Sequence, residues 1–232
     1  NYARAALETT PGQEASTALR EAIPELQGDL LIGVLGSIGV RRDVAAIDAI
    51  VPLLGQDNEA VAEAAARTLG HLGTPSTADL LRKRLSEATP KFRPAVGNAC
   101  LICAQRLAEQ GEREKAVALC DAVQDSNVPE YIRAAAAYNA IQLLGNDALP
   151  RLVEALNSGK ESHFRIALKA ARDLGVDASA DIVAQFAKHP PEQQALLLVA
   201  LGDIGNQTAL PTVVEAAKNG KSNVRIQAVR TL

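Results

Sequence analysis

The stretch Val34-Leu35-Gly36-Ser37-Ile38-Gly39 decides the fold, because close variants of it return along the chain. It recurs as Thr68-Leu69-Gly70-His71-Leu72-Gly73 and as Ala200-Leu201-Gly202-Asp203-Ile204-Gly205. Glycines that close such stretches follow one another at intervals of 30 to 38 residues: Gly39, Gly73, Gly111, Gly145, Gly175 and Gly205. A period of this length is typical of repeat proteins with one helix pair in each repeat.

Two further sets of similar segments recur in the same order around these glycines. The segments 65–69, 170–174 and 228–232 resemble one another before the glycine, and the segments 148–155 and 209–216 resemble one another after it. Since three independent sets of similar segments recur in the same order, the repeat is a property of the whole chain.

Each repeat is predicted to be a helix, a turn and a second helix, because apolar residues recur at helical spacing in both members. The first helices are expected at roughly 12–26, 41–55, 74–88, 112–124, 146–158, 176–188 and 206–219. The second helices are expected at roughly 28–39, 58–72, 90–110, 128–144, 160–174, 190–204 and 221–232. The closing glycines suit helix C-caps. Pro75, Pro129 and Pro191 suit helix starts, and Pro150 and Pro211 either bend a first helix or mark its true start.

Composition agrees with an all-α repeat fold. The chain has 232 residues, 47% hydrophobic but only 3% aromatic, which indicates a core of Ala and Leu between closely spaced helices. The formal net charge of −3 argues against a protein that coats nucleic acid, and no apolar run is long enough to span a membrane. We therefore predict a right-handed α-α superhelix of about seven helix pairs. Residues 1–232 are expected to form a single repeat domain, cut from a longer protein.

The repeats resemble the HEAT family, in particular the short bacterial HEAT-like repeats of phycobilisome lyases. Segments 61–73 and 224–232 carry the resemblance, with alanines before Leu-Gly-x-Leu-Gly in the first and a Val-Arg pair before alanine in the second. The resemblance covers nearly the whole chain, although the repeats at 74–111 and 177–205 depart from it. The order of repeats is also similar to HEAT-repeat regions of large exported proteins from planctomycete-type bacteria. This likeness implies a non-catalytic module of a larger protein with a periplasmic or secreted location.

Residues that often carry chemistry are better explained by structure. Cys100 and Cys103 form a C-x-x-C motif, and Cys120 is a third thiol, but the pair lies in an apolar helical run. We expect core packing and free thiols, with redox chemistry or metal binding as the alternative. His71, His163 and His189 lie in three different repeats, where surface or turn positions are expected. The sequence has no nucleophile elbow and no phosphate-binding loop, so we predict no catalytic residue, cofactor or metal.

Arginines near the starts of second helices suggest a structural role. Arg133, Arg165 and Arg225 share this position, and Asn127 and Asn219 precede two of them by six residues. HEAT families use a ladder in which such arginines bind turn carbonyls and polar side chains across repeats. The resemblance implies that ladder here, with contact to a partner as the alternative role.

The two helix layers differ in charge. The second helices carry 12 Lys and Arg against 9 Asp and Glu, whereas the first helices carry 11 against 15. In HEAT-type stacks the second helices line the concave side, which should therefore be the more positive one. The predicted contact residues on that side are Arg93, Arg133, Arg165, Lys169, Arg172 and Arg225.

The favoured function is a non-enzymatic scaffold for protein–protein interaction, with an acidic partner, no nucleic acid and no cofactor. A second hypothesis is a helper module that binds a small ligand, as the bilin-lyase resemblance implies. Others are a passive spacer and an accessory domain of a carbohydrate-active, 3-keto-disaccharide hydrolase-type protein. Partner identity and oligomeric state cannot be derived from the sequence.

Overall fold

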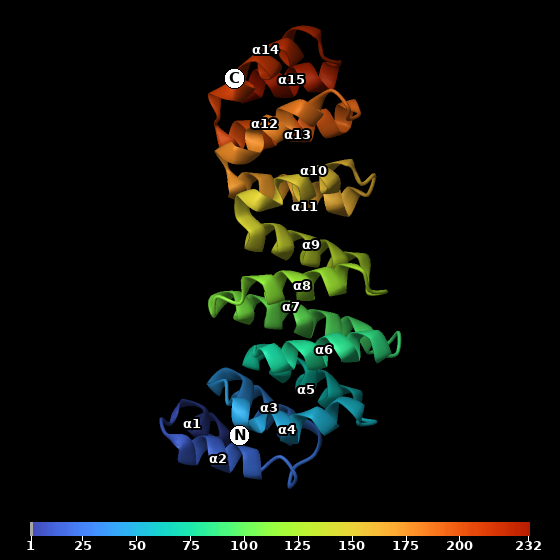
Figure 1. The fold of residues 1–232 in the computed structure, drawn as a ribbon. Helices are drawn as coiled ribbons and strands as arrows, with labels where there is room; N and C mark the ends of the chain where they lie inside the picture. Colours follow the sequence, from blue (N-terminus) through green and yellow to red (C-terminus); the bar gives the residue numbers. More distant parts are fainter. Residues whose placement is uncertain (1) are drawn as a thin grey trace. The chain divides into compact units, whose positions relative to one another are not determined.

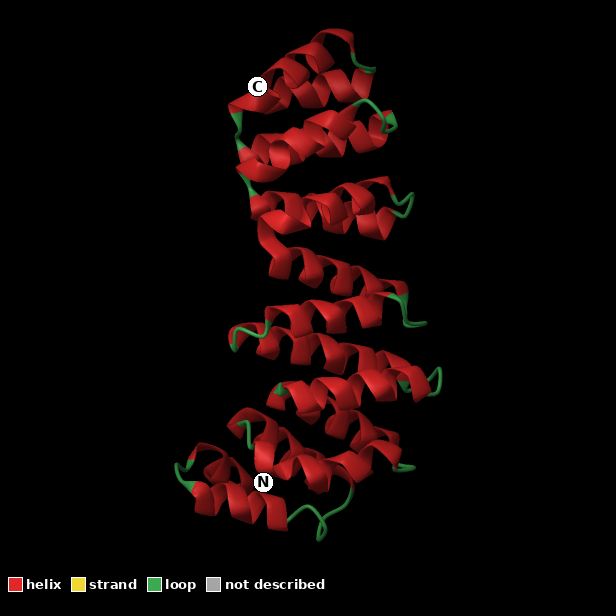
Figure 2. Ribbon diagram, in the orientation of Figure 1, coloured by secondary structure: helices red, strands yellow, loops and turns green. Residues whose placement is uncertain are grey.

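Helices joined by short turns make up the computed structural model, which describes residues 2–232 apart from the side chain of Val176 (Figure 1). No strand occurs among these residues, as Figure 2 shows, so the predicted all-α fold is confirmed. The chain consists of two compact units, Asn1–Ala136 and Ala137–Leu232. The right-handed winding of the whole chain and its description as a single domain stay predictions.

The first unit stacks its helices in chain order. Its second helices are α3 (Gly28–Arg41), α5 (Glu59–Leu72) and α7 (Arg93–Glu109), and α5 packs between the other two. The other elements are α1 (Tyr2–Thr9), α2 (Gln13–Glu21), α4 (Ile47–Ile50), α6 (Pro75–Glu87), α8 (Arg113–Gln124) and the start of α9 (Glu130–Leu144). Leu35, Ile38, Leu69 and Leu107 are fully buried in the layers between them.

The second unit repeats the pattern with α10 (Leu149–Asn157), α11 (Glu161–Leu174), α12 (Val176–Phe186), α13 (Pro191–Ile204), α14 (Leu210–Asn219) and α15 (Ser222–Thr231). Helices α11, α13 and α15 pack side by side, each against its own first helix. Phe164 is the largest side chain in a core otherwise built from Ala, Leu, Ile and Val. The unit therefore has its own hydrophobic core.

Small residues allow the second helices of the first unit to approach closely. A Cβ atom on Gly70 of α5 would lie 2.6 Å from the carbonyl oxygen of Ala99 in α7. On the other side of α5, a Cβ atom on Gly39 of α3 would lie 3.4 Å from the Cβ atom of His71. Recurrent glycine in this sequence therefore serves helix packing as well as helix ends.

The structure confirms most predicted helices and corrects three points at their ends. As predicted, helix ends have closing glycines with positive φ at Gly73, Gly145, Gly175 and Gly205. Gly39, in contrast, lies inside α3, and Arg42 is the left-handed C-cap of that helix, with φ 54°. The predicted helix 41–55 is broken into α4 and two 3-10 turns, Val44–Ala46 and Val51–Gly55, the second of which contains Pro52. Pro150 and Pro211 mark true helix starts, since each follows a 3-10 turn and lies in the first turn of its α-helix.

Helix α1 was not predicted, and polar contacts explain why it forms. It buries none of its own residues. Ser37 of α3 accepts a 2.7 Å hydrogen bond from Arg4 and donates one of 2.7 Å to Glu8. Arg41 donates to the carbonyl oxygens of Leu7 and Thr10, at 2.8 and 2.6 Å. Since these contacts join residues about thirty positions apart, no local sequence pattern reports them.

The C-cap of α5 offers a direct test of the packing. Gly73 has φ +60°, and a Cβ atom there would lie 2.1 Å from the Cβ atom of Arg106, whereas Gly111 has φ +84° and open space around it. Gly111→Ala should cost about 1–2 kcal/mol, the cost of a left-handed backbone. Gly73→Ala should cost about 1–3 kcal/mol more, because α7 must also shift. Urea unfolding of the two variants measures the difference, and equal losses would contradict the close contact.

Candidate functional site

Three of the predicted contact residues, Arg165, Lys169 and Arg172, lie on α11, and each of them has a carboxylate partner. Lys169 lies 3.8 Å from the centroid of the Tyr138 ring, donates to the hydroxyl of Tyr138, and lies 3.3 Å from a carboxylate oxygen of Asp173. The Tyr138 hydroxyl in turn donates a 2.7 Å hydrogen bond to Asp173. That bond lowers the pKa of Asp173, and the contact with Tyr138 raises the pKa of Lys169.

The other two basic residues of α11 are also paired. Arg172 Nε lies 2.6 Å from Asp203 of α13, and Arg165 lies 2.7 Å from Glu161 within its own helix. Their positive charges are therefore balanced locally, and this helix is less positive than a count of Lys and Arg suggests.

The remaining predicted contact residues are scattered. In the first unit, Arg93 donates a 2.6 Å hydrogen bond to the carbonyl of Ala88, and Arg133 pairs with Glu130. In the second unit, Arg225 borders an open hollow of about 400 Å³ with Ile226, Val229 and Arg230. Whether any of the six residues contacts a partner stays a prediction.

The predicted arginine ladder is wrong. Arg133 and Arg165 pair with carboxylates of their own helices, and Asn219 donates to Glu215 of α14. A carboxylate about one helical turn away therefore binds each of these two arginines, in place of the predicted groups of a neighbouring repeat.

Other residues make the bonds between repeats. Arg84 donates to the carbonyl of Leu54 at 2.7 Å, and Gln110 donates to the carbonyl of Gly73 at 2.9 Å. The most regular of these contacts comes from one position in the similar segments before the closing glycine. Thr68 and Thr231 each donate to a carbonyl 33 residues earlier, and Asp173 at the same position accepts from Tyr138. The repeated polar residue in segments 65–69, 170–174 and 228–232 could therefore have predicted these contacts between repeats, but the sequence analysis did not use it.

Truncation of Arg41 should destabilise α1, whereas truncation of Arg165 should have almost no effect. Arg165→Ala removes an exposed pair within one helix, so it should change the free energy of unfolding by at most about 0.5 kcal/mol. Arg41→Ala removes several charge-assisted bonds to carbonyl oxygens at the end of α1 and in the following loop. Hydrogen exchange should show α1 losing protection in Arg41→Ala alone, and protected α1 in that variant would contradict the assignment.

The three thiols lie in the core, as predicted. Cys100 and Cys103 of α7 and Cys120 of α8 are buried and form no disulfide. Burial raises the pKa of Cys100 and that of Cys103. Since a thiolate is the reactive form, these thiols are poorly suited to redox chemistry. Among the described residues, no group of three or more His, Cys, Asp or Glu side chains is placed to hold a metal ion.

The expectation for the histidines was wrong in part. His163 lies in α11 and is only 8% exposed. His189 does lie in a turn, but its ring is equally buried and packs on Phe164, with ring centroids 5.4 Å apart. His71 is half-buried in α5. An imidazole can fill space between Ala-rich helices, which have few aromatic side chains of their own.

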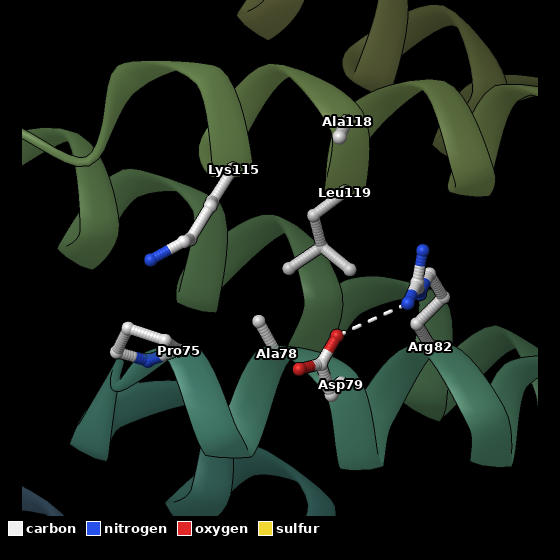
Figure 3. Close-up of a pocket in the computed structure, with 7 residues that line it drawn as sticks. All are labelled: Pro75, Ala78, Asp79, Arg82, Lys115, Ala118 and Leu119. Carbon is white, nitrogen blue, oxygen red and sulfur yellow. Dashed lines mark hydrogen bonds and ion pairs between the residues drawn. The ribbon is translucent and has the colours of Figure 1, made fainter.

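A shallow groove lies between two first helices of the first unit (Figure 3). Pro75 and Ala78 of α6 face Lys115 and Leu119 of α8 across it. Asp79 and Arg82 form a 3.1 Å ion pair at the rim. The groove encloses about 150 Å³, well below the roughly 300 Å³ at which pockets for drug-sized ligands begin.

A second cluster of basic residues in the first unit was missed by the sequence analysis. Arg42 follows α3, Arg67 and His71 lie one turn apart on α5, and Arg106 lies on α7 beside Glu109. Arg106 and Arg42 approach the Glu109 carboxylate to 2.8 and 3.5 Å. Burial lowers the pKa of His71, and the charges of Arg106, Arg67 and Arg42 lower it further. These groups are therefore close enough to act on one another.

The fold places the chain in the class of all-α helical-repeat proteins. Residues 15–101 match the family model of HEAT repeats, which confirms the predicted resemblance over α2 to α7. The match covers less than half of the chain, and the wider resemblance stays a prediction. No curated protein matches the sequence. In the described part of the chain, no helix is both long enough and apolar enough to span a membrane.

Proposed function

We propose that the chain is a non-catalytic module that binds another protein through the exposed face of its second helices. The observation that carries the proposal is the side-by-side packing of α3, α5 and α7 within the HEAT-matching region. HEAT repeats typically mediate protein interactions, and stacked helix pairs provide extended binding surfaces. Long polar side chains such as Glu63 and Arg67 project from the exposed side of α5.

The partner we propose is an acidic protein rather than a nucleic acid. The net charge of −3 opposes binding to the continuous phosphate backbone of a nucleic acid. The predicted second helices, with 12 Lys and Arg against 9 Asp and Glu, suit a shorter acidic segment instead. The module would belong to a larger, exported bacterial protein, as the resemblance to HEAT-repeat regions of planctomycete-type proteins implies. No observation favours the bilin-lyase-like helper or the carbohydrate-active accessory domain, and the small size of the α6–α8 groove weighs against a bound ligand there.

Site-specific photo-crosslinking in the source cells tests the proposal. A photoreactive side chain at Glu63, on the exposed side of α5, should give a discrete adduct with one protein. The matched control is Lys83 of α6, which is 74% exposed but lies among the first helices. No adduct from position 63, or the same adducts from both positions, would contradict binding through the second helices.

A further inference from the structure

The first unit carries an unbalanced basic cluster on its second helices. We call Arg42, Arg67, His71 and Arg106 the basic edge. They come from three successive second helices, since Arg42 directly follows α3, Arg67 and His71 lie on α5, and Arg106 lies on α7. The four side chains are close together, because Arg42 and Arg106 both approach Glu109 and the charges of all three arginines act on His71.

In the part of the chain that the structure describes, Glu109 is the one carboxylate that forms ion pairs with any of the three arginines. Glu109 lies 2.8 Å from Arg106 and 3.5 Å from Arg42, so it is shared between them. Among the described residues, Arg67 forms no ion pair, and its side chain is exposed. Glu63 lies one turn before Arg67 on the exposed side of α5, so three guanidinium groups have two carboxylates near them and a local excess of positive charge remains.

The equivalent position in the second unit shows what is missing. Arg67 and Arg172 occupy the same place in the repeated Ala-Ala-Arg motif, but Arg172 has Asp203 of the next second helix at 2.6 Å. Asp203 stands two residues before its closing glycine, and the corresponding residue of α7, the second helix that follows Arg67, is Glu109, which pairs with the other two arginines instead. Within α5 itself, His71 stands two residues before the closing glycine, the place where α11 has Asp173.

Stabilisation of helix ends explains only part of this arrangement. A basic residue in the last turn complements the helix dipole by about 0.3–1 kcal/mol. Arg67 lies in the middle of α5, however, and the charges of Arg106, Arg67 and Arg42 add to burial in lowering the pKa of His71. Arg42 is the one described residue other than glycine with positive φ, whereas α5 and α13 have glycine at that cap. Such strain is often found at functional sites.

We propose that the basic edge binds an acidic segment of the partner protein, with carboxylates of that segment held by Arg67 and Arg106. The inference rests on the proposed function and specifies its surface. Guanidinium groups bind carboxylates through paired, charge-assisted hydrogen bonds, which suits the exposed Arg67 and the partly exposed Arg106 on successive second helices. A bound carboxylate also offsets the field of Arg42, Arg67 and Arg106 at His71, so binding takes up a proton and tightens as the pH falls.

Hexaglutamate, acetylated and amidated at its ends, is the probe for this site, and calorimetry with the intact chain measures its affinity. The double variant Arg67→Gln/Arg106→Gln should weaken binding by about tenfold or more. Arg82→Gln, a change on α6 in the other helix layer, should leave it unchanged. Nuclear magnetic resonance should show the titration of His71 moving to higher pH when hexaglutamate is present, a readout that a loss of folding alone would not give.

The inference would be overturned by no binding of hexaglutamate, by equal binding by the double variant, or by equally tight binding of a short DNA duplex. Uncharged hexaglutamine bound as tightly as hexaglutamate would do the same. A position-specific crosslink from Glu63 alongside any of these results would leave the proposed function standing and reject only the basic edge as its surface.

Discussion

The close approach of α5 to α7 at Gly70 is the constraint on which the first unit depends. A single added methyl group there would lie 2.6 Å from the carbonyl oxygen of Ala99, well inside van der Waals contact. Because the backbones are this close, small residues fill the interior positions of α5, and Ala64, Ala65 and Ala66 are almost fully buried. The long polar side chains of Glu63 and Arg67 project from the exposed side, and the larger side chains of Leu69 and Leu72 are buried beside these alanines.

The same closeness makes the polar contacts between repeats possible. Thr68 can reach the carbonyl of Leu35 at 3.0 Å only because its short side chain lies where α5 meets α3. In the second unit, Thr231 makes the corresponding bond to Leu198 at 3.3 Å. A hydroxyl that binds a neighbouring helix in this way is satisfied although it is buried or partly buried, and it sets the register between helices.

The sequence predicts the helices well because their signals are local. Apolar spacing, closing glycines and prolines at helix starts all act within one or two turns. Helix α1 depends instead on Ser37 and Arg41, which lie about thirty residues away. The arginine ladder failed for a different reason, since Arg165 and Arg133 pair with Glu161 and Glu130 of their own helices.

Charge balance, rather than the number of basic residues, separates the two units. A count of Lys and Arg in the sequence favoured α11 as a binding surface, because this second helix has three basic residues. In the structure, Asp173, Asp203 and Glu161 balance their charges. The basic edge has fewer carboxylates for a similar number of arginines. That difference is visible only when side chains from successive second helices are placed beside one another.

The free energies of unfolding of Gly70→Ala and Gly36→Ala test the packing account most directly. Both glycines hold the same place in the repeated motif inside a helix, but a Cβ atom on Gly36 would meet nothing within 4 Å. Helix propensity alone predicts that each change stabilises the protein by about 0.5–1 kcal/mol. We expect that gain for Gly36→Ala and a loss of about 1–3 kcal/mol for Gly70→Ala. Stabilisation by both changes would contradict the close contact between α5 and α7.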